Sequence, residues 1–217
     1  MAAIVKVQKR KKEEYLMKKL SKIATTLDVY FKIGYWFTLI ITALCIPVII
    51  IFLLMSRNNP ELFRGMVQSL NFGNISFRIA DAYAANAESG RILMLLSLVI
   101  GTISFPIYCL MIRAIRKILA PMKEGLPFQE TIAKNLMNLG WLVIINGTLN
   151  LILDAVSSHI IFSIYDMQTL FLSEKIASVS TFYHFNLTFV LYALVLMGLA
   201  CIFRYGQELQ PLSDETL

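Results

Sequence analysis

Four long apolar segments alternate with polar stretches along this chain. They cover residues 30–55, 92–111, 139–162 and 187–203. A helix that crosses ~30 Å of hydrocarbon needs about 20 mainly apolar residues, and each segment meets or approaches that length. The pattern therefore predicts an all-α membrane protein, a four-transmembrane-helix bundle that forms one membrane domain over residues 1–217.

The composition agrees with a membrane location. Hydrophobic residues make up 57% of the 217 residues and charged residues only 16%, with a mean hydropathy of +0.66. Soluble domains are usually about a quarter charged. The net charge of +6 does not indicate nucleic-acid binding, because the basic residues lie mostly at the ends of apolar segments, where anionic lipid headgroups are the expected partners. The three cysteines show no CxxC spacing, which argues against a zinc site.

Basic residues are distributed unequally between the two sides of the predicted spans. Fifteen of the 20 lysines and arginines lie on one side: they precede the first span or, for Lys32, lie just inside its start, connect the second span to the third, or end the fourth. Cytoplasmic segments carry such an excess. The sequence therefore predicts a multi-pass protein of the cytoplasmic membrane, with the N-terminus and the C-terminus both in the cytoplasm.

Residues 1–29 form a basic segment with a helical period. Leu16, Leu20, Ile23 and Leu27 are spaced i, i+4, i+7 and i+11, and lysines occupy other faces. This pattern predicts a cytoplasmic amphipathic helix that joins the first span and lies on anionic lipid headgroups. An alternative is a docking surface for an acidic cytoplasmic partner; direct nucleic-acid binding is not expected, because no recognition motif accompanies the charge.

The outer loop, residues 56–91, contains a candidate hairpin. Apolar and polar residues alternate over positions 72–79 around Gly73 and Asn74, a pair with turn chemistry. The alternation predicts a short β-hairpin on the extracytoplasmic side.

Residues 112–138 are the predicted inner connection, and residues 204–217 are a predicted cytoplasmic tail. Pro121, Gly125 and Pro127 are expected to break the second helix before a new helix leads into the third span. The candidate cytoplasmic face consists of Arg113, Arg116, Lys117, Phe128, Arg204 and Tyr205.

The Pro127-Phe128 pair followed by Asn135, and above all the ending IFRYGQELQPLSDETL, resemble the DUF2975 family of small bacterial four-span membrane proteins. The similar arrangement extends over nearly the whole chain. The function of the family is not established, but its members are often encoded beside a small helix-turn-helix regulator. The resemblance thus implies a regulatory component of the bacterial inner membrane with a helix-turn-helix regulator as its cytoplasmic partner, and it supplies no catalytic residue.

Asn146, Asn150 and Asp154 form an intramembrane polar stripe, since their i, i+4, i+8 spacing places them on one helical face. A carboxylate within the membrane costs at least ~2.5–3.5 kcal/mol, so this face is expected to point toward other helices. One interpretation is hydrogen bonding between helices. The other is a polar cavity around Asp154, open to the outside, that binds a small ligand or an ion. The candidate partners are Ser97, Ser104, Tyr108, His159, His184 and Tyr192.

The sequence contains no paired-histidine zinc motif, no nucleophile with a base in register and no Gly-rich phosphate loop. We therefore expect no enzymatic activity, no cofactor and no bound metal. The favoured function is a non-enzymatic sensor or regulatory component that signals to a cytoplasmic partner. The alternative is a small transporter or oligomeric channel with a polar interior around Asp154. Four spans without an internal repeat are expected to form such a path only as a homo-oligomer.

Overall fold

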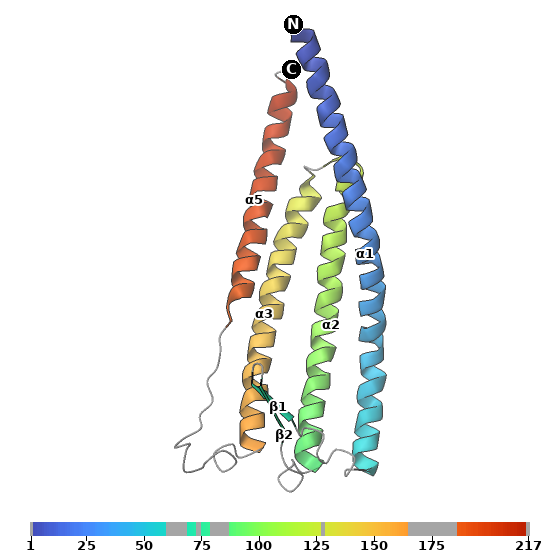
Figure 1. Ribbon diagram of the computed structural model, residues 1–217, viewed down its shortest axis with the longest axis vertical. Helices are drawn as coiled ribbons and strands as arrows, with labels where there is room; N and C mark the ends of the chain where they lie inside the picture. The colour runs from blue at the N-terminus through green and yellow to red at the C-terminus, as the bar shows by residue number, and fades with distance from the viewer. Residues whose placement is uncertain are drawn as a thin grey trace. The chain divides into compact units, whose positions relative to one another are not determined.

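The computed structural model consists of long helices and one small hairpin (Figure 1). It describes residues 2–59, 69–72, 75–78, 87–126, 129–164 and 186–215. The helices are α1 Ala2–Asn58, α2 Ala87–Lys123, α3 Glu130–Ile164 and α5 Thr188–Glu215. Each contains a stretch long and apolar enough to cross a membrane, which confirms the predicted all-α, multi-pass fold class.

The helices extend well beyond the predicted spans, because the apolar pattern marks only the part that hydrocarbon requires. α1 has 57 residues and joins the basic segment 1–29 to the first span without interruption. α2 continues to Lys123, so the predicted connection 112–138 is largely helical. α5 continues to Glu215 and includes most of the predicted tail.

α2 ends at Lys123, so Pro121 lies inside its last turn, and Gly125 caps the helix two residues beyond its end. Gly125 has a φ of +76°, a left-handed conformation that favours glycine. The Leu126 amide donates to the Pro121 carbonyl at 3.0 Å, and the Gly125 amide donates to the Met122 carbonyl at 3.3 Å. This pair of bonds is the Schellman motif, which satisfies the last carbonyls of a helix. Pro127 lies outside the described residues.

The predicted hairpin is confirmed. Strands β1 Ser69–Phe72 and β2 Ile75–Arg78 pair antiparallel, with Leu70 opposite Phe77 and Phe72 opposite Ile75. The predicted turn residues and Ile79 lie outside the described residues.

The chain divides into two compact units, here called unit 1 and unit 2. Unit 1 comprises Met1–Ile40, Pro106–Gly147 and Leu187–Leu217, and unit 2 comprises Ile41–Phe105 and Thr148–Asn186. Unit 1 contains parts of all four helices, whereas unit 2 contains parts of α1, α2 and α3 together with the hairpin.

The hydrophobic core of unit 1 joins α2, α3 and α5. Its buried members are Ala114, Ile118, Ile132, Leu136, Leu139 and Ala200. Small residues bring α3 and α5 together: a Cβ atom on Gly140 would lie 2.8 Å from Met197 Cγ and 3.2 Å from the Ala193 carbonyl oxygen. Ion pairs and a hydrogen bond attach α1 to α2, so unit 1 is a four-helix bundle.

Candidate functional site

An ion cluster attaches α1 to the end of α2 in unit 1. The Nε of Arg116 lies 3.0 Å from Oδ1 of Asp28, and the Lys123 ammonium pairs with Oδ2 of the same carboxylate. The Asp28 side chain is only 14% exposed, whereas those of Arg116 and Lys123 are 32% and 31% exposed. Two cations therefore compensate one largely enclosed carboxylate. We call Asp28, Arg116 and Lys123 the Asp28 ion cluster.

The spacing of residues on α1 explains why this carboxylate meets α2. Ser21, Ala24 and Asp28 are spaced i, i+3 and i+7 and so share one helical face. Ala24 is 2% exposed, which allows close approach, and Ser21 Oγ donates to the Lys123 carbonyl at 2.6 Å. That carbonyl belongs to the last turn of α2, where a lysine also interacts favourably with the helix dipole. Ile23 and Leu27, members of the predicted apolar stripe, are exposed instead.

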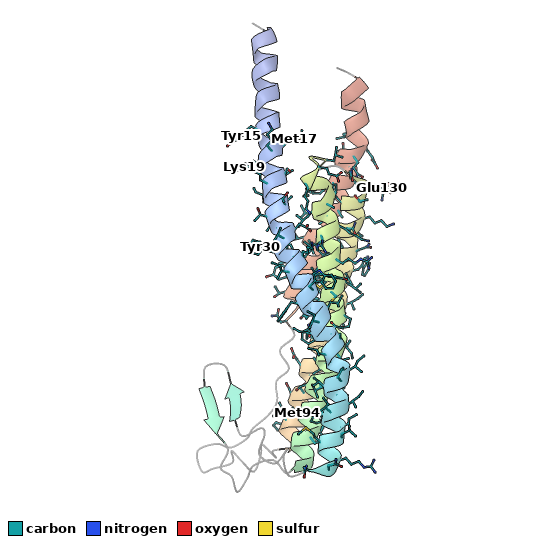
Figure 2. The ribbon with its side chains drawn as sticks, turned by 90° about the vertical axis from the view of Figure 1, so that its right-hand side faces the viewer. Tyr15, Met17, Lys19, Tyr30, Met94 and Glu130 are labelled. Atoms are coloured by element: carbon teal, nitrogen blue, oxygen red, sulfur yellow. The ribbon has the colours of Figure 1, made fainter. Side chains whose placement is uncertain are left out.

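A basic cleft adjoins the cluster, between the N-terminal part of α1 and the end of α2. Its volume is about 660 Å³, and it shares Ser21 and Lys123 with the contacts just described. Four lysines and one glutamate line it: Lys18, Lys19, Lys22, Lys123 and Glu124. We call it the lysine cleft. Tyr15 and Met17 also line it, and both belong to the N-terminal part of α1 (Figure 2). The excess of cations fits an acidic ligand surface.

The predicted cytoplasmic face is only partly available for a partner. Arg113 and Lys117 are exposed, but Arg116 is half-buried against Asp28. Arg204 lies 3.9 Å from Glu208 one turn along α5, and both side chains are exposed. Tyr205 is also exposed. Phe128 lies outside the described residues.

The three residues of the polar stripe differ in burial along α3. The Asn146 Oδ1 atom is buried and accepts no hydrogen bond from any described residue. Asn150 is half-buried, and Asp154 is exposed. Asp154 forms no hydrogen bond or ion pair with the part of the chain that the structure describes. No α3 residue from 148 to 163 is buried. Among the described residues, then, the Asp154 carboxylate lies at the surface, whereas the sequence predicts that it faces other helices.

No candidate partner that the structure describes forms a hydrogen bond or ion pair with Asp154. Ser104 is buried with an Oγ that has no partner among the described residues, whereas Ser97 is exposed. Tyr108 and Tyr192 are exposed and belong to unit 1. His159 is exposed, and its carbonyl accepts a bond from Ser163. His184 lies outside the described residues. Among the residues that are described, no three His, Cys, Asp or Glu side chains lie close enough together to hold a metal ion.

Asp28 is the site residue that sequence reasoning missed. Its signal is faint: one carboxylate that immediately precedes the first apolar segment, in a region otherwise dominated by lysines. Its two cations lie 88 and 95 positions further along the chain. Local periodicity gives no information about such a pairing.

Comparisons with known protein families, curated proteins and solved structures find no match to this chain. The resemblance to the DUF2975 family therefore stays a prediction. The fold and the site define a class of protein, a multi-pass helical membrane protein. Its long helix α1 is ion-paired to the end of α2, and the two helices line a basic cleft at that point.

Proposed function

We propose that this protein is a non-enzymatic sensor or regulatory component of the bacterial cytoplasmic membrane that signals to a cytoplasmic partner through the lysine cleft. The observation that carries the proposal is the Asp28 ion cluster. It holds the basic part of α1 against the end of α2 and so gives the cleft two walls. By its resemblance to the DUF2975 family, the partner is a helix-turn-helix regulator.

Lys123 connects the lysine cleft to the Asp28 ion cluster, so binding of a partner in the cleft can affect the contact between α1 and α2. Its ammonium pairs with Asp28, and the same residue lines the cleft. An acidic side chain of the partner competes with Asp28 for this ammonium, so partner binding changes how firmly α1 is held on α2. Coupling of this kind between two sites is typically worth about 1–3 kcal/mol. Because the cleft is open to water, the association should weaken as salt screens its charges.

The asymmetry of basic residues supports a cytoplasmic location of the cleft and of both termini. A fluorescent protein fused to the C-terminus should fold and fluoresce, whereas a periplasm-dependent phosphatase fused there should be inactive. The opposite pair of results would place the cleft outside the cell and end the proposal.

The function itself is tested by complementation in the native host. Gene deletion should change the transcript profile, and wild-type protein should restore it. The variant Lys18→Gln/Lys19→Gln/Lys22→Gln removes three cleft charges and should fail to restore it at equal membrane abundance. The matched control Lys32→Gln/Arg57→Gln/Lys134→Gln removes three charges outside the lysine cleft and should complement. Full complementation by the cleft variant would show that the cleft does not signal.

The exposed Asp154 favours a second candidate function, a small transporter or channel that forms as a homo-oligomer. A carboxylate exposed within an apolar helix is costly in lipid, and a second copy of the chain that covers it would relieve that cost. This candidate predicts ion flux into proteoliposomes that Asp154→Asn abolishes. Absence of flux in the wild-type protein would remove it.

A further inference from the structure

A second open cleft lies between α2 and α3 in unit 1, with a volume of about 470 Å³. The residues that matter in it are Leu110, Arg113, Lys117, Asn138, Trp141 and Leu142; we call it the Arg113 groove. Among the residues that the structure describes, no carboxylate lines this groove. By contrast, Glu124 lines the lysine cleft, and Glu130 and Glu208 line a larger groove between α3 and α5.

The two cations of the groove, Arg113 and Lys117, have no acidic partner in the described part of the chain. Arg113 and Lys117 are one turn apart on α2 and both are exposed. Neither forms an ion pair with any residue that the structure describes, unlike Arg116, which Asp28 holds. Like charges at this spacing repel each other. An anionic group that contacts both would therefore be stabilised twice, by attraction to each cation and by relief of their repulsion.

The apolar residues of the groove belong to the predicted spans, and its charged and polar residues lie just outside them, at the level expected for lipid headgroups. Leu110 belongs to the apolar segment 92–111, and Trp141 and Leu142 belong to the apolar segment 139–162. Arg113, Lys117 and Asn138 lie just outside these segments. Leu110 is 50% exposed and Trp141 56% exposed, so both are open to an external molecule. Tryptophan is enriched at the boundary between headgroups and hydrocarbon.

We propose that the Arg113 groove binds the phosphate of an anionic phospholipid such as phosphatidylglycerol. The planar guanidinium of Arg113 and the ammonium of Lys117 donate to the phosphate oxygens. The Asn138 amide donates to a headgroup oxygen, and one acyl chain lies along Leu110 and Leu142 beside the Trp141 ring. A soluble phosphate would use only the cations and leave the exposed apolar half of the groove empty, which is why a lipid is the ligand assigned. This proposal does not depend on the signalling function.

Tryptophan fluorescence of the full-length protein tests the assignment directly. The chain has two tryptophans, Trp36 and Trp141, so Trp36→Phe leaves Trp141 as the single reporter. This variant is reconstituted in phosphatidylcholine vesicles that contain a minor fraction of either brominated phosphatidylglycerol or brominated phosphatidylcholine. Brominated chains quench a tryptophan that they contact. The expected result is much stronger quenching by brominated phosphatidylglycerol than by the same fraction of brominated phosphatidylcholine.

Charge variants in the same background locate the lipid. Each cation near an anionic lipid contributes about fivefold in affinity, so Arg113→Gln/Lys117→Gln should lower the relative affinity for phosphatidylglycerol by about 25-fold. The control Lys32→Gln/Lys134→Gln removes the same charge from exposed lysines outside the groove and should keep the preference.

Three results would overturn the proposal. Equal quenching by the two brominated lipids in the wild-type groove would show no recognition of the anionic headgroup. Equal losses in the two double variants would show attraction to general surface charge only. Displacement of brominated phosphatidylglycerol by a similar concentration of glycerol 3-phosphate would assign the groove to a soluble phosphate. If the groove variant does not assemble, the wild-type comparison of the two lipids decides the matter alone.

Discussion

Replacement of Asp28 by asparagine should destabilise unit 1 by about 2 kcal/mol. Asparagine keeps the size of the side chain and one acceptor oxygen, so the change removes chiefly the charge. Exposed ion pairs are worth at most about 1 kcal/mol, whereas removal of one member of a buried pair costs about 3–5 kcal/mol. Asp28 is 14% exposed and its two cations about a third exposed, which places the cluster between these limits.

Thermal unfolding in detergent measures this loss. For a chain of about 150–250 residues, 1 kcal/mol corresponds to about 2–4 °C in Tm, so Asp28→Asn should lower Tm by about 4–8 °C. The control is Glu124→Gln, which removes the same charge from an exposed side chain that pairs with no described residue. It should change the stability by less than about 0.5 kcal/mol.

A double-mutant cycle separates the ion cluster from other effects at Asp28. Arg116→Gln should cost much less stability in the Asp28→Asn background than in the wild type, because the partner of Arg116 is already neutral there. Equal Tm values for Asp28→Asn and Glu124→Gln, or strictly additive effects in the cycle, would refute the reasoning.

Three further predictions concern the packing and the polar stripe. Gly140→Ala should destabilise unit 1 by about 1–3 kcal/mol, because its methyl group meets Met197 and a backbone oxygen, whereas Gly198→Ala, with nothing within 4 Å, should be neutral or stabilising in the same Tm assay. Ile132→Ala should cost about 2–5 kcal/mol in unfolding free energy, because Ile132 is 0% exposed in the core; a loss under 1 kcal/mol would contradict that burial. Asp154→Asn should leave Tm unchanged, because the carboxylate is exposed and bonds no described residue; a collapse in membrane abundance would place it in a buried network instead.

The four spans and the hairpin could be predicted because both depend on patterns within short stretches of chain. Length and hydropathy are sufficient for a span, and alternation around Gly73 and Asn74 is sufficient for a hairpin. The hydropathy pattern gives the spans but not the ends of the helices, since charged residues continue a helix into water. A break of the second helix over Pro121, Gly125 and Pro127 could also be predicted: α2 ends at Lys123 within this stretch, where Gly125 supplies the left-handed cap.

The site was less predictable because it depends on contacts between distant parts of the chain. The burial of Arg116 against Asp28 follows from the packing of α1 on α2, which no local spacing encodes. The polar stripe was predicted to face other helices from the cost of a charge in lipid. That prediction holds for Asp154 only if another part of the chain, or another copy, covers the carboxylate and so removes the cost.

The central claim, that an acidic cytoplasmic partner binds the lysine cleft, is tested most directly by photo-crosslinking in the native host. Tyr15 lines the cleft and is 68% exposed, and Tyr192, 61% exposed on α5, is a matched control. Benzoylphenylalanine at either position replaces one aromatic side chain with another and keeps every lysine. The account predicts an adduct with a cytoplasmic protein at position 15 that disappears in the Lys18→Gln/Lys19→Gln/Lys22→Gln variant, and no such adduct at position 192. Lipid adducts alone at position 15, or a protein adduct that persists without the three lysines, would contradict it.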